Sequence, residues 1–484
     1  MADRADVVVI GAGVGGLAVA TRLAASGRRV VVCERRDLTG GKLACLRRDG
    51  FSVDVGPSLL TLPNVFEEVF RMAGTSLSEH VELVRLDPQF HYHWSDGSSL
   101  VVPDGTDATA AAFERLAPGA GEQWRRFDER AGRIWEIAAR TFLAGPMGGP
   151  WQLARRLRSP ADLVAIQPHR TLHGLAAAHF TDPRLVQWAG RYATYSGSSP
   201  YRAPATLACI AHVESHHGCW YVRGGLDVLR SALESVAAAA GVEIRVRSEV
   251  VRIAAAGRVT GVELADGMRI EAPVVVANAD AERVHASLLR DRRAQRAVRR
   301  AGRSTSGLVI AAGVRDRTAE IGHHNVWFAS DDRAEFAALE AGRMADAPTI
   351  YGCVSAVTDP SQAPAGDENW FILVNTPPGI ELDAAAEHDR VLDRLAAHGV
   401  DLRQRLAWSE VLTPADFESR YGAPGGAIYG TSSNGRRAAF LRPANRTRCR
   451  GLYLVGGSSH PGGGLPLVAI SARIVADLVA SDDR

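Results

Sequence analysis

A glycine-rich turn between two apolar runs constrains the fold more than any other part of this 484-residue chain. Residues 7–10 are valine and isoleucine only, which predicts a buried parallel strand. The spacing G-x-G-x-x-G occupies residues 11–16, a helical pattern follows, and a second, mostly apolar run at residues 29–33 ends at Glu34. Strand, glycine turn, helix, strand and terminal acid together predict a βαβ unit that binds a dinucleotide.

Each residue of this fingerprint has a physical role. Gly11 permits the tight turn, Gly13 lets the backbone approach a pyrophosphate, and Gly16 lets the helix pack closely on the strand. Together with Gly15, they lie at the helix N-terminus, whose free N–H groups and partial positive charge stabilise phosphate. Glu34 is placed to accept hydrogen bonds from ribose hydroxyls.

Composition narrows the class of protein. The chain has 56 basic and 54 acidic residues, a balance that gives no sign of a nucleic-acid partner. Its six cysteines lack C-x-x-C or metal-ligand spacing, so we expect reduced thiols and no metal site. No stretch reaches the length of an apolar membrane span, and the first apolar run is the predicted strand rather than a leader. We therefore expect a cytoplasmic protein, and the sequence leaves its oligomeric state open.

Two further glycine turns follow the same logic. Gly41 and Lys42 end a turn after the second strand, and a short strand then leads into residues 56–58, Gly-Pro-Ser. Near the C-terminus, a predicted strand at residues 451–455 precedes a glycine cluster at residues 456–464 and a helix. Such a cluster offers a second cradle of backbone N–H groups.

Taken together, these turns resemble the extended FAD signature of the amine oxidase and carotenoid desaturase superfamily. The resemblance implies an α/β fold with a Rossmann-like FAD-binding domain and an interleaved substrate domain of mixed sheet and helices. It also implies that the following residues bind FAD: Gly11, Gly13, Gly15, Gly16, Glu34, Arg35, Gly41, Lys42, Gly56, Pro57, Ser58, Val250, Gly456, Gly457, Gly464, Leu465 and Pro466.

The domains implied by this resemblance are discontinuous. The FAD-binding domain comprises residues 1–80, 218–300 and 421–484. The substrate-binding and membrane-contacting domain comprises residues 81–217 and 301–420.

Two stretches in the middle of the chain carry a more specific resemblance. Residues 191–207 (RYATYSGSSPYRAPATL) and 218–233 (GCWYVRGGLDVLRSAL) are similar to bacterial carotenoid desaturases of the phytoene desaturase type. The most similar branch acts at the 3,4 position of acyclic, often 1-hydroxylated, carotenoids. From the residues alone, Tyr195, Trp220 and Tyr221 either line a cavity for a long polyene or pack in an ordinary core.

Desaturation removes a hydride and a proton, and the resemblance assigns the hydride to flavin N5. Glu214 and Asp54 are the candidate proton acceptors. Asp54 could instead fix a loop, and Glu214 could pair with an arginine. We expect His460 to be a turn residue. Because no second dinucleotide fingerprint is present, oxygen or a quinone is the expected electron acceptor.

Other functions remain open at this point. A phytoene- or lycopene-forming desaturase, or an oxidase of carotenoid end groups, would share the same fold. An amine oxidase generally needs a flavin-facing lysine well after the fingerprint, whereas Lys42 is the only lysine of the chain. A non-enzymatic isoprenoid escort protein would not need the retained glycines.

One segment suggests contact with a membrane surface. Residues 143–150 are apolar and loop-like, and residues 151–158 are basic and amphipathic with one tryptophan. This composition favours contact with anionic lipid, although a solvated helix face would have the same pattern. We therefore expect peripheral association with a membrane.

Overall fold

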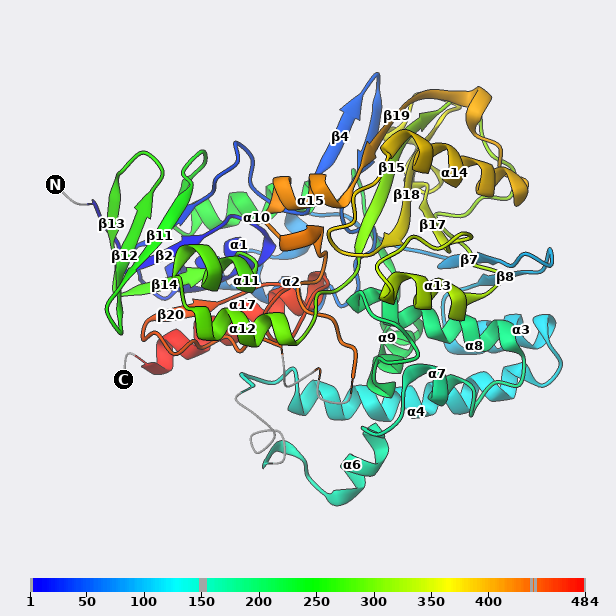
Figure 1. Cartoon of the computed structure of the whole chain (residues 1–484), viewed down its shortest axis with the longest axis horizontal. Helices are drawn as coiled ribbons and strands as arrows, with labels where there is room; N and C mark the ends of the chain where they lie inside the picture. The colour runs from blue at the N-terminus through cyan, green and yellow to red at the C-terminus, as the bar shows by residue number, and fades with distance from the viewer. Residues whose placement is uncertain (1–2, 148–154, 436–437, 439–441, 483–484) are drawn as a thin grey trace.

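The computed structural model describes residues 3–147, 155–435, 438 and 442–482. Segments far apart in the sequence interleave to form two main sheets, which lie in opposite halves of the molecule along its long axis (Figure 1). One sheet contains the predicted βαβ unit, and the other belongs to the segments between the glycine turns.

The first sheet is parallel and five-stranded. Its strand order is β10 (Glu243–Arg245), β3 (Val30–Cys33), β2 (Val7–Ile10), β14 (Val274–Ala277) and β20 (Leu452–Leu454). Strands β2, β3 and β14 are fully buried, which explains their continuous apolar runs. The N-terminal, central and C-terminal parts of the chain therefore meet in one sheet.

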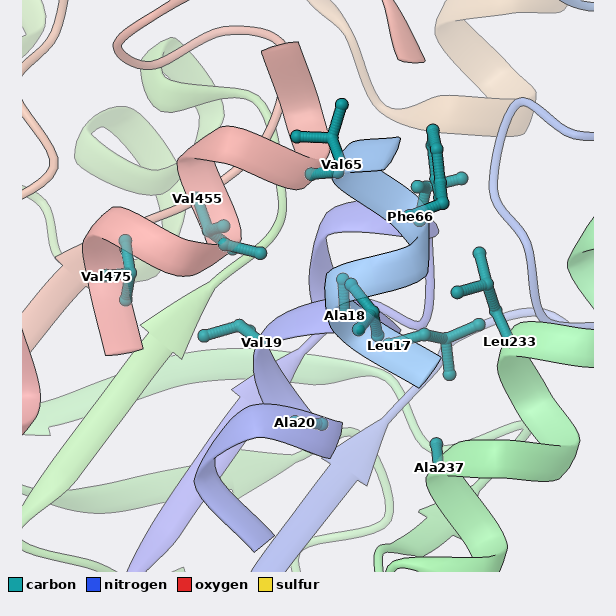
Figure 2. Close-up of a cluster of buried hydrophobic side chains, with 14 of the residues drawn as sticks. Leu17, Ala18, Val19, Ala20, Val65, Phe66, Leu233, Ala237, Val455 and Val475 are labelled. Atoms are coloured by element: carbon teal, nitrogen blue, oxygen red, sulfur yellow. The ribbon is translucent and has the colours of Figure 1, made fainter. Parts of the chain in front are cut away.

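Four helices cover one face of this sheet. They are α1 (Val14–Ala25), α2 (Asn64–Met72), α10 (Leu226–Ala239) and α17 (Leu465–Asp482). Figure 2 shows Leu17 of α1 beside Phe66 of α2 and Leu233 of α10, all in one hydrophobic cluster. Each buried side chain of this size contributes about 1.5–3 kcal/mol. This packing holds the helix after the glycine turn in place.

The other face carries a smaller, four-stranded sheet. Its strands are β1 (Asp3–Arg4), β13 (Arg269–Glu271), β12 (Val259–Leu264) and β11 (Val250–Ala255), and α11 (Ala281–Arg283), a π-helix (Val284–Leu288) and α12 (Arg292–Arg300) follow. The basic stretch at residues 282–300 has a helical pattern, but it does not form one continuous helix. Arg290 has a φ of 58°, and the Asp291 side chain accepts hydrogen bonds from two backbone N–H groups, so a new helix starts there.

The second main sheet has seven strands and brings residues 90–102 beside residues 306–412. Its order is β19 (Leu406–Leu412), β15 (Ser306–Val314), β18 (Glu368–Thr376), β17 (Ile350–Cys353), β16 (His324–Trp327), β7 (Phe90–His93) and β8 (Ser99–Val102). Only the β16–β7 pair is parallel. Two small antiparallel pairs are the hairpin of β4 (Cys45–Arg48) with β5 (Phe51–Asp54), and the long-range pair of β6 (Leu83–Arg85) with β9 (Trp220–Val222).

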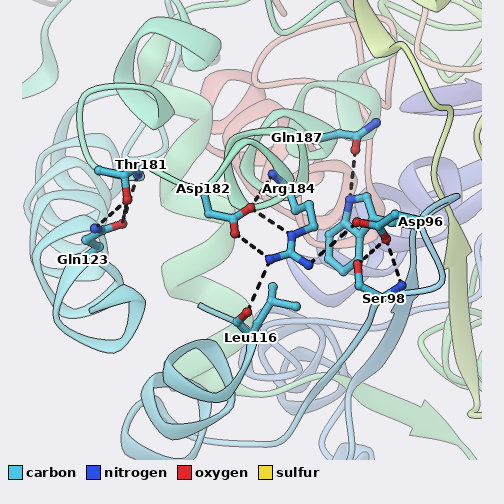
Figure 3. Close-up of polar contacts among 9 residues, drawn as sticks. Asp96, Ser98, Leu116, Gln123, Thr181, Asp182, Arg184 and Gln187 are labelled. Atoms are coloured by element: carbon cyan, nitrogen blue, oxygen red, sulfur yellow. Dashed lines mark hydrogen bonds and ion pairs between the residues drawn. The ribbon is translucent and has the colours of Figure 1, made fainter. Parts of the chain in front are cut away.

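The remaining helices lie in the same half of the molecule as this sheet (Figure 1). They are α3 (Thr106–Leu116), α4 (Ala120–Thr141), α6 (Pro160–Ile166), α7 (Leu172–Ala176), α8 (Pro183–Gly190), α9 (Cys209–His217), α13 (Asp332–Glu340), α14 (Ala384–Ala397) and α15 (Pro414–Tyr421), of which α6 contacts α4. Figure 3 shows one polar clamp among them. The Arg184 side chain at the start of α8 donates to Asp182 and to the carbonyl of Leu116 at the end of α3. The predicted α/β fold is confirmed.

Candidate active site

A single cavity of about 510 Å³ runs between the two main sheets. At one end, Gly13 and Glu34 line it at the carboxyl ends of β2 and β3, where open α/β sheets bind their ligands. At the other end, Phe328 and Phe336 line it, and Phe336 belongs to α13. Because α1 and α13 lie in opposite halves of the molecule (Figure 1), the cavity extends from one half to the other.

The first glycine turn is shaped for close approach of a ligand to the backbone. Helix α1 begins at Val14, so its first N–H groups have no partner within the helix. A Cβ on Gly13 would come within 2.8 Å of Asn278 Nδ2, and one on Gly41 within 3.1 Å of the Gly13 Cα. A Cβ on Gly16 would lie 2.0 Å from the Gly11 carbonyl oxygen, so Gly16 serves helix packing.

Glu34 is held rigidly at this end of the cavity. Its Oε2 accepts a hydrogen bond from the Ala12 N–H at 2.8 Å, and its Oε1 accepts one from the Arg36 N–H at 2.9 Å. Each carboxylate oxygen has a further lone pair. Glu34 can therefore accept from two ribose hydroxyls without losing its own anchoring bonds.

The C-terminal glycine cluster (residues 456–464) lies against the first glycine turn. A Cβ on Gly15 would lie 3.3 Å from the Cα of Gly456, and Asn278 contacts both glycines. The Asn278 amide also donates to the Gly11 carbonyl at 3.3 Å. Asn278 follows β14 directly, and its position at the carboxyl end of that strand is the only sign in the sequence that it belongs to the site.

Lys42 lies in the cavity wall. Its ammonium donates to the carbonyl of Ile428, and burial lowers the pKa of Lys42 to about 8 despite the nearby carboxylate of Asp280. A Cβ on Gly56 would lie 1.8 Å from the Lys42 carbonyl oxygen, so only glycine fits there. The two predicted turns around residues 41 and 56 are therefore in direct contact.

Most of the residues expected at the cofactor meet around this cavity. Those that line it are Gly11, Gly13, Gly15, Glu34, Arg35, Gly41, Lys42, Gly56, Pro57, Ser58, Val250, Gly457, Gly464, Leu465 and Pro466. Gly16 and Gly456 lie behind the lining residues. The glycine cradles and the anchored acid fit a dinucleotide.

The rest of the wall is mostly apolar and comes from alternate residues of the seven-stranded sheet. Val309, Val326, Tyr351, Phe371 and Leu373 all line the cavity. Successive strand residues point to opposite faces, so one face of this sheet forms the wall. The strands themselves were predictable, but the sequence does not indicate which of their two faces meets the cavity.

Of the three aromatic residues expected to line a substrate cavity, the structure places only Tyr195 there. The Tyr221 hydroxyl donates to Asp359 at 3.1 Å, and the Trp220 indole donates to the His217 carbonyl at 2.9 Å. Neither Trp220 nor Tyr221 lines the cavity, and both belong to β9, which pairs with β6.

Glu214 is buried behind Tyr195. It accepts hydrogen bonds from the hydroxyls of Tyr195 at 2.6 Å and Tyr192 at 2.9 Å, and Arg191 Nη1 lies 3.9 Å away. Burial raises the pKa of Glu214. The Arg191 guanidinium in turn lies 4.3 Å from the centroid of the Phe90 ring. Glu214 thus pairs with an arginine, and it lies behind Arg191 and Tyr195, which both line the cavity.

Asp54 also lies outside the cavity lining. Its carboxylate accepts a hydrogen bond of 2.7 Å from the Leu226 N–H at the start of α10, and burial raises the pKa of Asp54 to about 7. It therefore fixes the end of β5 to that helix. His460 is a buried turn residue before a cis-proline, with Nε2 3.1 Å from the Gly145 carbonyl oxygen.

The segment expected to touch lipid differs from the prediction in part. Leu143 and Met147 are buried, and Arg156 donates to the Thr141 and Pro146 carbonyls, so this loop packs inward. Residues 148–154 of this segment lie outside the described residues. Among the residues that the structure describes, no helix has the length and apolar character needed to cross a membrane.

The chain matches the family of flavin containing amine oxidoreductases over residues 14–480, and it belongs to that family. It is an FAD-dependent oxidoreductase, and the expected cofactor is confirmed.

The similar curated proteins are named as carotenoid enzymes. Hydroxyneurosporene desaturase of Rhodobacter capsulatus is 37% identical over 491 residues, which cover 100% of this chain and 99% of that protein. The 4,4'-diapolycopene oxygenase of Methylomonas sp is 34% identical over 491 residues, which cover 99% of both. The resemblance to carotenoid desaturases is therefore confirmed.

Solved structures support the fold. An oxidoreductase from Methanosarcina mazei superposes with a TM-score of 0.67 at 18% identity, covering 97% of this chain and 99% of that chain. At this identity the similarity concerns the architecture alone.

Proposed function

We propose that this protein is a carotenoid desaturase that introduces C=C bonds into an acyclic C40-type carotenoid, at the 3,4 position. The observation that carries this proposal is the continuous cavity, in which a dinucleotide cradle opens into a long apolar wall. The names of the similar proteins support a carotenoid substrate, and residues 191–207 and 218–233 support the 3,4 position.

Bound FAD supplies a hydride acceptor at N5. The chain has to hold a long polyene beside it and exclude water. Val326, Phe371 and Leu373 form an apolar surface for this purpose, and burial of the polyene against them supplies the binding energy.

We assign the acceptance of the proton that the substrate loses to the Tyr195–Glu214 pair. Tyr195 lines the cavity and donates its hydroxyl proton to Glu214, so it can accept a substrate proton as it passes its own to the carboxylate. The raised pKa of Glu214 favours this transfer. In this proposal Tyr195 is the catalytic residue and Glu214 is the positioning residue, while Asp54 has a structural role.

The proposal includes a membrane surface, from which an insoluble carotenoid would enter. Helix α6 projects from the body of the molecule (Figure 1) and exposes Leu163 and Val164, with Arg155 and Arg158 shortly before it in the chain. Exposed apolar side chains flanked by arginine suit an interface with anionic lipid. This location replaces residues 143–147 as the proposed contact.

Two further parts of the proposal concern the electron acceptor and the domains. Oxygen or a quinone reoxidises the flavin, because the sequence contains no second dinucleotide fingerprint. We retain the division into an FAD-binding domain and a substrate domain at the bounds given above, since the cavity runs between the sheets of the two.

Product analysis tests the function. Purified FAD-loaded protein is incubated with liposomes that contain an acyclic carotene or its 1-hydroxylated form, and the products are analysed by chromatography and mass spectrometry. Loss of two hydrogens per new double bond, with a red shift in absorbance, supports desaturation. Unchanged carotenoids with a fully loaded flavin would contradict it.

The alternative is oxidation of a carotenoid end group, favoured by the 34% identity to a protein named as an oxygenase. The same experiment separates the two functions, because an oxidase adds oxygen to the product. Amine oxidation is less well supported, since Lys42 is engaged with the Ile428 carbonyl at the cofactor end of the cavity.

A further inference from the structure

A cluster of three side chains outside the cavity has the composition of a metal site. It consists of Asp128 on α4 and of His212 and His216 on α9, and their ligand atoms all lie within 4.8 Å of one another. Because the two histidines are four residues apart on one helix, they project from the same face, toward the carboxylate.

Both imidazoles point at the same carboxylate. His212 Nδ1 lies 2.9 Å from Asp128 Oδ1, and His216 Nε2 lies 2.8 Å from Asp128 Oδ2. The two rings are nearly stacked, with centroids 4.0 Å apart. Two imidazole nitrogens and one carboxylate therefore face one another between the helices.

We propose that Asp128, His212 and His216 bind a divalent first-row transition metal ion, for which Zn²⁺ is the probe. Imidazole nitrogen with carboxylate oxygen is a donor set that suits Zn²⁺. A tetrahedral ion with bonds of about 2.0–2.1 Å separates its ligand atoms by about 3.3 Å. The two nitrogen–oxygen distances of 2.9 and 2.8 Å would have to lengthen by a few tenths of an ångström to reach that geometry.

The surroundings make space for the His212 imidazole and leave His216 open to solvent. A Cβ on Gly132 would come within 2.8 Å of His212 Cε1, so the glycine in α4 makes space for the imidazole. The His216 side chain is 41% exposed, which gives an ion access from solvent and leaves a position for water. Thr106 Oγ1, 3.1 Å from His216 Nε2, is an additional oxygen at the edge of the site.

Metal binding here would fix α9, which also contributes to the cavity. Ile210 of α9 lines the cavity, and Glu214 of α9 accepts the Tyr195 hydroxyl. The ion would replace the two imidazole protons that otherwise bond to Asp128, and so would join α9 to α4 through coordinate bonds. Its role is therefore structural, at a distance from the reacting groups.

The sequence pattern does not reveal this site, and it predicts no metal. The spacing between Asp128 and His212 exceeds eighty residues. A histidine pair four apart is common on helices, so only the packing of α4 against α9 completes the donor set.

The test uses the untagged, FAD-loaded protein and isothermal titration with Zn²⁺. We expect saturable binding of one equivalent, weakened about tenfold or more by Asp128→Asn or His212→Ala, since even outer-shell changes cost that much. Asp128→Asn is the more informative variant because it preserves the shape of the side chain. His169→Ala, which removes an exposed histidine outside the cluster, is the matched control and should bind as the unaltered protein does.

A second measurement identifies the ligands. X-ray absorption at the zinc edge should show nitrogen and oxygen at about 2.0–2.2 Å, and the thermal midpoint should rise with Zn²⁺ in the unaltered protein but not in Asp128→Asn. The proposal is overturned if no saturable binding occurs, if Asp128→Asn binds as tightly, or if sulfur at about 2.3 Å dominates the spectrum.

Discussion

The dinucleotide end of the cavity is built from backbone, whereas the end near α13 is built from side chains. At the first end, Gly13 and Gly41 lie so close that a Cβ on either would meet a neighbouring atom. At the second, Val326 belongs to β16 and Phe328 follows that strand directly, while Phe336 belongs to α13, so this part of the wall forms only in the folded protein. A site made of backbone tolerates almost no substitution, while a wall of apolar side chains can be reshaped by volume.

The largest effect is expected where this difference is sharpest. Gly13→Val should abolish FAD binding, because the side chain would occupy the space of the pyrophosphate and collide with Asn278. The flavin content of the purified variant measures this. Gly27→Ala is the control, since a Cβ there meets nothing within 4 Å and costs only about 1–2 kcal/mol of backbone strain. Full flavin content in Gly13→Val would refute the assignment of this turn.

The side-chain end should respond to volume and not to cofactor binding. Val326→Trp would narrow the cavity, so kcat/KM for an acyclic carotenoid should fall about 100-fold, or about 2.7 kcal/mol, while FAD content stays the same. Val101→Trp, on the exposed face of β8, is the matched control. If Val326→Trp loses its flavin instead, the two ends are not independent.

The contrast also explains what the sequence could reveal. The glycine turns, Glu34 and the βαβ unit were predictable because their function depends on short spacings along the chain. Of the three aromatic candidates, Tyr195 lines the cavity, whereas Trp220 and Tyr221 do not. Their orientation follows from the pairing of β9 with β6, which no local pattern specifies.

The same reasoning applies to the buried acids. Glu214 and Asp54 are both carboxylic acids, and the sequence alone does not distinguish their roles. Their surroundings differ, because Glu214 meets two tyrosine hydroxyls and an arginine, and Asp54 meets a helix N-terminus. Asn278 was missed for a related reason, since it contacts both glycine turns only through tertiary structure.

Tyr195→Phe sharpens the comparison within the substrate wall. It removes the hydroxyl that contacts Glu214, so kcat should fall about tenfold. This is less than general acid–base catalysis often contributes, because a proton beside a carbocation is lost easily. Trp220→Phe should leave kcat unchanged, since that indole lies outside the cavity. Equal losses in both variants would argue for a general packing effect.

The smallest effect is expected at the lipid contact. Replacing Leu163 and Val164, which are 48% and 72% exposed, with glutamate should lower the vesicle-bound fraction about fivefold. Co-sedimentation with anionic liposomes measures this fraction. Met268→Glu, at an exposed site on the four-stranded-sheet side, is the control. Unchanged sedimentation of the α6 variant would exclude that helix as the contact.

The central claim is that one cavity holds FAD and a carotenoid together, so the most direct measurement is an anaerobic single turnover. FAD-loaded protein is mixed with an acyclic carotenoid in liposomes, and flavin absorbance and carotenoid products are followed in the same sample. We expect bleaching of one flavin for each C=C bond formed. Bleaching by amines but not by carotenoids, or new double bonds without flavin reduction, would contradict the account.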